Sequence, residues 1–197
     1  MTPQADSILD LFRARGAYLQ GHFRLTSGLH SSEYLQSALV LQHPQAAEEL
    51  GRRLAAELRR VASDVPALVA SPALGGLIIG HEVARAFQVR FLFTERDAAT
   101  GKMTLRRGFQ VARGETAVVV EDVITTGGST REVIDLLEAA GVRVLAAGSL
   151  IDRSGGQADV GVPRVALATL AVSTHDPAQC PLCAQGLPVV KPGSRPA

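Results

Sequence analysis

No apolar run in this sequence approaches the length needed to cross a membrane, and the amino terminus has no basic and then apolar signal pattern. We therefore expect a cytoplasmic protein. The net charge is only +1 and the basic residues are not gathered into a stripe, which argues against nucleic acid as the main partner. The Walker pattern Gly-x-x-x-x-Gly-Lys and the Rossmann pattern Gly-x-Gly-x-x-Gly are both absent, so nucleoside triphosphates and dinucleotides lose their main support as ligands.

Cysteine is scarce, and the two cysteines form a single Cys180-x-x-Cys183 pair near the carboxyl terminus. Such a pair supplies half of a tetrahedral zinc site, and His175 can add a third ligand, but the sequence offers no evident fourth. A redox pair is expected at the start of a helix that follows a strand, whereas Pro177 and Pro181 indicate an irregular tail. The sequence therefore favours two reduced structural thiols over a metal site.

Apolar residues make up 46% of the 197-residue chain, enough for one domain with a full core and a small appendage. Helical spacing of apolar residues predicts helices, and apolar runs predict strands between them. The predicted helices cover residues 7–15, 44–60 and 76–87, and the predicted core strands cover 67–70, 90–94, 118–120, 144–151 and 165–172. This alternation predicts an α/β fold with a mostly parallel sheet of about five strands and ligands at their carboxyl ends.

The most informative stretch is residues 118–130, Val-Val-Val-Glu-Asp-Val-Ile-Thr-Thr-Gly-Gly-Ser-Thr. Its β-branched residues predict a buried strand, and the turn rich in Thr and Gly opens a helix that ends at Gly141. The first N–H groups of a helix have no intrahelical partner and carry the positive end of the macrodipole, so the turn predicts a phosphate site. Gly127 and Gly128 let the backbone approach the anion, and the neighbouring hydroxyl groups add donors.

Two acids, Glu121 and Asp122, stand at the carboxyl end of this strand, just before the phosphate turn. A site built for phosphate alone has no use for them, unless the ligand also carries hydroxyl groups or a metal ion. A sugar phosphate satisfies both conditions. The alternative is a plain turn between strand and helix with an acidic rim, which explains a single acid and a single glycine better than it explains the whole stretch.

A long polar interruption covers residues 95–115, and we expect residues 95–113 to form a flexible lid. Two glycines, Gly101 and Gly108, provide flexing points. A polyanionic leaving group explains the cations of this segment, and an exposed hairpin with ordinary surface charge explains them nearly as well. These cations are Arg96, Lys102, Arg106 and Arg107.

The apolar run, the two acids and the turn rich in Thr and Gly resemble the phosphoribosyl diphosphate signature of the type I phosphoribosyltransferases. Further stretches at 21–34, 72–76, 150–153 and 176–183, together with the lid, extend the resemblance to the orotate phosphoribosyltransferase family over nearly the whole chain. The resemblance implies the type I phosphoribosyltransferase fold in a single domain, residues 1–197. Within it, a small amino-terminal hood (1–43) joins the carboxyl-terminal tail (173–197), and residues 44–172 form the core.

The resemblance also implies a reaction, in which ribose 5-phosphate passes from phosphoribosyl diphosphate to orotate in the biosynthesis of pyrimidines. It implies Mg²⁺ held mainly by substrate and water rather than by protein ligands, and a homodimer whose lid acts in trans. Orotate binding then falls to Thr125 and Arg153, and catalysis to Glu121, Asp122 and Lys102. The residues implied for binding phosphoribosyl diphosphate are Arg96, Lys102, Glu121, Asp122, Val123, Ile124, Thr125, Thr126, Gly127, Gly128 and Ser129.

Two positions depart from the family pattern, because better-known members carry lysine where this chain has Thr26 and Gly75. We therefore expect the diphosphate to find its cations in the lid. A purine phosphoribosyltransferase and a non-catalytic regulator that senses phosphoribosyl diphosphate remain alternatives. The hood and Arg153 argue against the first, because a purine has no carboxylate, and the cationic lid argues against the second.

Overall fold

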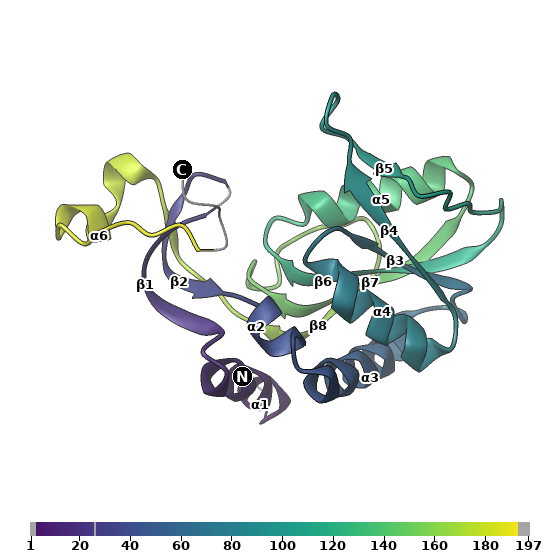
Figure 1. Ribbon diagram of the computed structural model, residues 1–197, viewed down its shortest axis with the longest axis horizontal. Coiled ribbons are helices and arrows are strands. Elements are labelled where there is room, and N and C mark those ends of the chain that lie inside the picture. Colours follow the sequence, from purple (N-terminus) through teal and green to yellow (C-terminus); the bar gives the residue numbers. More distant parts are fainter. Residues whose placement is uncertain (1–2, 26, 193–197) are drawn as a thin grey trace.

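The computed structural model describes residues 3–25 and 27–192, so Thr26 lies outside the described residues. A six-stranded sheet in the order β5-β4-β3-β6-β7-β8 forms its centre (Figure 1). The strands are β3 (Leu68–Pro72), β4 (Arg90–Arg96), β5 (Met103–Leu105), β6 (Thr116–Ile124), β7 (Arg143–Asp152) and β8 (Arg164–Thr169). The neighbours from β4 to β8 pair in parallel, whereas β5 is antiparallel to β4 at the edge. The prediction of a mostly parallel sheet is confirmed, with β5 as an added edge strand.

Helices cover both faces of this sheet (Figure 1). The longer ones are α1 (Pro3–Ala14), α3 (Pro44–Val61), α4 (Gly76–Phe87) and α5 (Gly128–Ala139), and a short α2 (Ala38–Leu41) precedes α3. The first helix begins at Pro3 rather than near Ser7, where the sequence placed its start. In the described part of the chain, no helix combines the length and the apolar character of a membrane span.

Strand β6 shows why two helical layers form. Its side chains alternate between two hydrophobic clusters, because successive residues of a strand point to opposite faces of a sheet. Val118 and Val120 pack into the cluster that contains α1, α3 and α4, and Ala117 and Val119 pack into the cluster that contains α5. Burial on both faces accounts for the unbroken apolar run that marks this strand in the sequence.

A second, smaller sheet forms the hood from β1 (Tyr18–Arg24), β2 (His30–Leu35) and β9 (Thr174–His175), in the order β1-β2-β9. The tail then continues through a 3₁₀ helix (Pro177–Gln179) and α6 (Pro181–Ala184), two short turns within an otherwise irregular segment. It returns to β1, where the N–H of Arg24 donates to the carbonyl of Val190 at 2.8 Å and the N–H of Val190 donates to the carbonyl of His22 at 2.8 Å. The two ends of the chain therefore build the hood together.

The lid segment begins as a hairpin of β4 and β5 that projects beyond the edge of the sheet (Figure 1). Arg96 is held by the carboxylate of Glu132 on α5, with N–O distances of 2.8 and 3.0 Å. Arg107 forms a similar two-pronged pair with Glu95, at 2.8 Å for both bonds. Lys102, in contrast, forms no ion pair within the described residues.

Gly80 marks the closest approach of α4 to the sheet and yields a stability prediction. A Cβ atom added there would lie 2.1 Å from Oγ of Ser71 and 2.5 Å from Cε2 of Phe91. Alanine inside a helix is ordinarily more stable than glycine by about 1 kcal/mol, but overpacking a core costs about 1–3 kcal/mol. We expect overpacking to dominate, so Gly80→Ala should lower the free energy of unfolding in urea. Adding Ser71→Ala should recover only part of the loss, because the Phe91 ring remains. A Gly80→Ala variant as stable as the parent chain contradicts this packing.

Candidate active site

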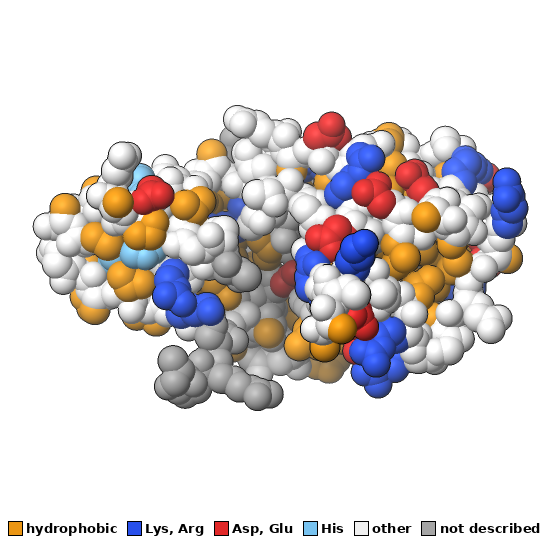
Figure 2. Space-filling view, turned by 90° about the horizontal axis from the view of Figure 1, so that it is seen from above, with side chains coloured by type: hydrophobic (Ala, Val, Ile, Leu, Met, Phe, Trp, Pro, Cys, Tyr) orange, Lys and Arg blue, Asp and Glu red, His pale blue; other side chains and the backbone are white. Residues whose placement is uncertain are grey.

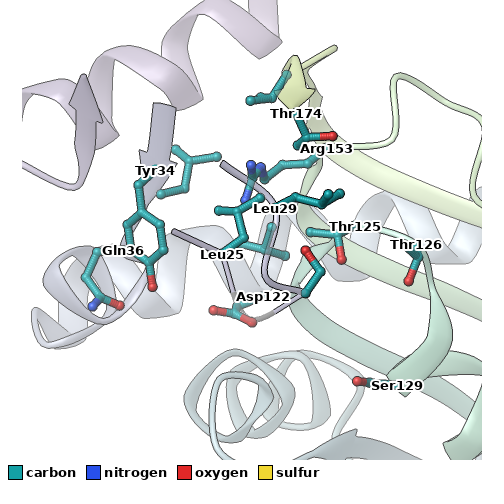
Figure 3. Close-up of a pocket in the computed structure, with 14 residues that line it drawn as sticks. Leu25, Leu29, Tyr34, Gln36, Asp122, Thr125, Thr126, Ser129, Arg153 and Thr174 are labelled. Atoms are coloured by element: carbon teal, nitrogen blue, oxygen red, sulfur yellow. The ribbon is translucent and has the colours of Figure 1, made fainter. Parts of the chain in front are cut away.

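A cavity of about 600 Å³ opens between the hood and the carboxyl ends of the parallel strands (Figure 3). In open α/β sheets, ligands bind at this edge. Figure 2 shows the hood and the core as two lobes, with acidic and basic side chains interspersed over the core lobe on this face. The cavity is lined by Leu25, Ser27, Leu29, Tyr34, Leu35, Gln36, Val172 and Thr174 on one side and by Asp122, Val123, Thr125, Thr126, Ser129 and Arg153 on the other.

The phosphate turn has the geometry that its sequence predicts. Gly127 has φ +83°, and a Cβ atom there would lie 2.8 Å from Cγ1 of Val160, so this position requires glycine for two reasons. The N–H of Arg131 bonds to the carbonyl of Gly127 at 2.8 Å, which leaves the N–H groups before it without a partner four residues back. The hydroxyl groups of Thr125, Thr126 and Ser129 border the cavity beside these donors (Figure 3).

Six of the eleven residues assigned to diphosphate binding do not line this cavity, namely Arg96, Lys102, Glu121, Ile124, Gly127 and Gly128. Ile124 is buried in the core, and Gly127 and Gly128 shape the turn with their backbone. No residue of the lid segment 95–113 lines the cavity, neither Arg96 nor Lys102, although Arg96 is close enough to Glu121 to lower its pKa. The cations of the lid therefore do not meet the cavity of their own chain in this structure.

The two acids at the end of β6 occupy different surroundings. Asp122 faces the cavity, whereas Glu121 accepts a hydrogen bond from the hydroxyl group of Thr130. Burial raises the pKa of Glu121 to about 7, with a further rise from Asp122, although the Thr130 hydrogen bond and Arg96 act in the opposite direction. Burial also raises the pKa of Asp122. No lysine or arginine is ion-paired with either acid within the described residues, so their negative charge remains available to a ligand.

Gly75 allows the start of α4 to approach Asp122. A Cβ atom at Gly75 would lie 2.5 Å from Oδ1 and 2.8 Å from Cγ of Asp122. In this arrangement any side chain at position 75, lysine included, displaces the carboxylate. The departure from the family pattern at Gly75 therefore has a steric consequence inside the site, and the cation that a lysine supplies elsewhere is absent from this position.

Asp152 organises the turn that follows β7. Its carboxylate accepts hydrogen bonds from the N–H of Ser154 at 2.7 Å and from its hydroxyl group at 2.6 Å, and it pairs with Arg164 at 2.6 Å. Burial by itself raises the pKa of Asp152, but the Ser154 hydrogen bonds and Arg164 outweigh burial and hold the pKa below its ordinary value. Asp152 is therefore neutralised inside the protein and is not the partner of Arg153, its neighbour in the sequence.

Arg153 enters the cavity with its charge unmatched (Figure 3). Its N–H donates to the carbonyl of Ile124 at 2.8 Å, which anchors the backbone next to the phosphate turn. The Nε atom is buried and has no hydrogen-bond partner among the described residues. Burial lowers the pKa of Arg153, and Glu33 and Tyr34 act against this shift. A partly buried guanidinium group with a free donor is suited to a carboxylate, which it can bind with two parallel hydrogen bonds.

The hood contributes cavity residues that the sequence did not assign. Tyr34 lies near both charged groups of the cavity, and burial and Asp122 raise its pKa whereas Arg153 lowers it. Leu25 and Leu29 flank Arg153 (Figure 3). The only signal for these residues was the resemblance of the stretch 21–34, which indicates a role for the segment without identifying the side chains.

A second group of polar side chains lies in the hood, outside the cavity wall. Atoms of His22, His30, Cys180 and Cys183 lie within 4.8 Å of one another. The sequence offered His175 as a third ligand if the cysteines bind a metal, but His175 is not a member of this group. Two histidines from the opposite end of the chain take its place.

Comparisons with known proteins agree with this geometry. Residues 38–170 match the family model described as "Phosphoribosyl transferase domain". The chain is 55% identical to an orotate phosphoribosyltransferase of Heliobacterium modesticaldum over 190 residues, 96% of this chain and 98% of that protein. It is 50% identical to the corresponding protein of Thermotoga petrophila over 188 residues, 95% of this chain and 98% of that one. The chain belongs to the orotate phosphoribosyltransferase family.

Solved structures of phosphoribosyltransferases share the fold. The orotate phosphoribosyltransferase of Aeropyrum pernix superposes with a TM-score of 0.67 at 28% identity, covering 83% of this chain and 93% of that one. An adenine phosphoribosyltransferase from Leishmania tarentolae has a TM-score of 0.61 at 18% identity, with 83% and 87% coverage, and shows the fold alone. The type I phosphoribosyltransferase fold predicted from the sequence is thus confirmed.

The raised pKa of Glu121 makes stability depend on pH. Between the ordinary value of 4.5 and about 7, the folded state retains a proton that the unfolded state has released. The free energy of unfolding therefore falls as the pH rises through this window. Glu121→Gln has no proton to lose, so its stability relative to the parent chain should increase from pH 4.5 to 7 and then level off, as measured by urea unfolding.

Glu138→Gln, which removes an exposed carboxylate near the end of α5, serves as the control for loss of a charge. A difference between Glu121→Gln and the parent chain that is constant from pH 4.5 to 7 contradicts the effect of burial on Glu121.

Proposed function

We propose that this protein catalyses the magnesium-dependent transfer of ribose 5-phosphate from phosphoribosyl diphosphate to N1 of orotate. The products are orotidine 5′-phosphate and pyrophosphate. The observation that carries the proposal is the unpaired Arg153 in the same cavity as Asp122 and the phosphate turn. These groups suit the three polar parts of the reacting pair, namely the orotate carboxylate, the ribose hydroxyl groups and the 5′-phosphate.

Each wall of the cavity would hold one part of the substrates. The turn at residues 125–129 offers hydroxyl groups and the start of α5 to the 5′-phosphate. Arg153 would bind the carboxylate of orotate in a two-pronged pair, with Thr125 on the pyrimidine side. The apolar side chains Leu25 and Leu29 would cover the ring from the hood, which excludes water from the reacting atoms (Figure 3).

Catalysis would be largely positional and electrostatic. When the bond at the anomeric carbon breaks, positive charge develops on the ribose and negative charge on the departing pyrophosphate. Asp122, at the cavity wall and without an ion-paired cation, would hold the ribose hydroxyl groups and stabilise the positive charge. Glu121, whose orientation is fixed by the hydrogen bond from Thr130, would add to the negative potential next to Asp122.

The residues at the end of β6 fit a magnesium ion shared with the substrate. Carboxylates are hard oxygen ligands of the kind that Mg²⁺ prefers. Burial raises the pKa of both Glu121 and Asp122, and neither acid has a paired cation in the described residues. When bound near Glu121 and Asp122, Mg²⁺ would supply positive charge that neutralises the diphosphate. The cytoplasmic location expected from the sequence stays a prediction.

An assay with several bases tests the proposal against its rivals. Consumption of orotate, followed by absorbance in the presence of phosphoribosyl diphosphate, is measured beside adenine, hypoxanthine and uracil. Of the four bases, we expect only orotate to be turned over. Turnover with a purine indicates a purine phosphoribosyltransferase, and binding of phosphoribosyl diphosphate without turnover of any base indicates a regulator.

Arg153→Lys should separate the two substrates. Lysine keeps the charge but loses the planar fork, so the change should cost on the order of 1 to 3 kcal/mol in kcat/KM for orotate. The Kd for phosphoribosyl diphosphate, measured by calorimetry, should hardly change. Arg143→Lys, at the other end of β7 and paired with Asp64 on the surface, is the matched control and should leave both values unchanged. Equal losses for both substrates in Arg153→Lys mean that this residue supports the structure instead.

We further propose that the protein acts as a homodimer in which the lid of one subunit reaches the site of its partner. Three observations support this arrangement: lid residues are absent from the cavity wall of their own chain, Lys102 is without an ion pair in the described residues, and Gly75 leaves no room for a cation next to Asp122. Lys102 would then stabilise the charge on the departing pyrophosphate in trans.

Mixing two inactive variants tests the lid proposal. Lys102→Ala should lower kcat by about 10²- to 10³-fold, because it removes charge stabilisation in the transition state. After exchange of subunits with Asp122→Asn, each hybrid dimer would hold one intact site and one doubly altered site. Equal mixing should therefore restore about a quarter of the parent activity, since about half of the dimers are hybrids. Exchange confirmed by mass spectrometry without recovery of activity shows that the lid acts within its own subunit.

A further inference from the structure

The hood contains four side chains whose arrangement the proposed reaction does not require. His22 comes from β1, His30 from β2, and Cys180 and Cys183 from the tail, Cys180 directly before α6 and Cys183 within it. One ligand atom from each lies within 4.8 Å of the other three. His22, His30 and Cys180 are buried, with 4%, 6% and 3% of their surface exposed. None of the four lines the cavity of the candidate active site.

Four of the six distances among these atoms lie within about 0.4 Å of the edges of a tetrahedral zinc site. The Nε2 atom of His22 lies 2.9 Å from Nδ1 of His30, 3.5 Å from Sγ of Cys180 and 3.7 Å from Sγ of Cys183. The Sγ atom of Cys183 lies 3.3 Å from Nδ1 of His30. Ideal zinc bonds to nitrogen and sulfur give edges of about 3.3 Å between two nitrogens and about 3.5 Å between nitrogen and sulfur.

Hydrogen bonds alone do not explain why three polar atoms lie close to Nε2 of His22. Its Nδ1 atom lies 2.8 Å from the carbonyl oxygen of Leu187, which can only accept, so Nδ1 carries the proton. The neutral ring then has one lone pair, on Nε2, and three polar atoms surround it. A single lone pair aimed at the centre of a group of ligand atoms is the arrangement of a metal-bound histidine, whose other nitrogen commonly donates to a backbone carbonyl.

The backbone around the group explains how the histidines meet. The pairing of β1 with β2 changes register between Gln20 and Phe23, which is the mark of a β-bulge. His22 and Phe23 are both buried although they are adjacent, so the bulge breaks the strict alternation of the strand. A bulge that turns a polar side chain into the interior of a small hairpin calls for a polar partner there.

We propose that His22, His30, Cys180 and Cys183 bind one Zn²⁺ ion, which joins the amino-terminal hairpin to the carboxyl-terminal tail. Two thiolates and two imidazoles form a closed tetrahedral set that favours zinc and leaves no open position for catalysis, so the site is structural. It differs from the magnesium of the proposed reaction, which prefers oxygen ligands.

The position of the site gives it a role in shaping the active site. The chain between its two histidines contains Leu25 and Leu29, which line the cavity. The ligands are separated by up to 161 residues along the chain, so a metal bond between them closes a very long loop. Zinc would therefore hold the cavity-facing loop of the hood in place through the tail.

The first test is metal content, which requires no measurement of activity. The full chain, purified under reducing conditions without added metal or chelator, is analysed by inductively coupled plasma mass spectrometry. We expect about one zinc per chain. After removal of the metal, titration with Co²⁺ should give the intense visible bands of a tetrahedral ion and a thiolate charge-transfer band. A reduced chain that holds no zinc and gives no such cobalt spectrum overturns the proposal.

Variants then identify the ligands. Cys183→Ser and His30→Ala should lose the bound zinc, whereas His175→Ala, a histidine of the neighbouring β9 strand outside the group, should retain it. A zinc chelator should lower the Tm of the parent chain and of His175→Ala but not that of Cys183→Ser. Zinc retained by both Cys183→Ser and His30→Ala overturns the assignment. If either variant fails to fold, the cobalt spectrum of the parent chain decides whether sulfur and nitrogen are ligands.

A disulfide is the competing use of the two cysteines. Mass spectrometry of protein alkylated at lysis distinguishes a disulfide from zinc binding. Two free thiols are expected for zinc binding and none for a Cys180–Cys183 bond. A complete disulfide in freshly isolated protein overturns the proposal. Because metal content and thiol state are measured without substrates, their outcome is independent of whether the protein transfers ribose 5-phosphate.

Discussion

Two partly buried acids, adjacent in the sequence at the end of β6 and without a paired cation among the described residues, are the feature on which the site depends. Burial raises the pKa of both Glu121 and Asp122, so their charge is held at a cost in stability. The neighbouring turn supplies positive potential from the start of α5, and Gly75 permits α4 to approach Asp122 closely. A lysine or arginine at this position would stabilise the folded protein by pairing with the acids. Its absence leaves the acids available to the ligand.

The opposite wall of the cavity presents the opposite charge, because Arg153 is a cation without a paired anion. Asp152 is the acid nearest to Arg153 in the sequence, but Ser154 and Arg164 engage it on the other side of the turn. That network keeps Arg153 from being neutralised by its own neighbour. The cavity is therefore polarised, with negative charge at the end of β6 and positive charge after β7, as two substrates of mixed charge require.

The hood completes the cavity, but by itself it is a small structure. Its sheet consists of one hairpin and a two-residue strand from the tail, and a hairpin alone is marginally stable in water. The backbone bonds of Val190 and the group around His22 tie the hairpin to the tail. Leu25 and Leu29 border the cavity from this hairpin. The contacts between hairpin and tail therefore help to hold the apolar wall of the cavity in place.

The sequence by itself determined the features that arise from neighbouring residues: the parallel sheet, most helix bounds, the phosphate turn with Gly127, the acid pair and an arginine after β7. These follow from periodicity and turn chemistry over a few residues. Only the tertiary structure decided which distant groups meet. It brought Tyr34 into the same cavity as Asp122 and Arg153, and it paired Asp152 with Arg164. It also replaced His175 as the partner of the cysteines with histidines on strands up to 161 residues away. No local pattern encodes such contacts, because they depend on how the chain ends fold back onto each other.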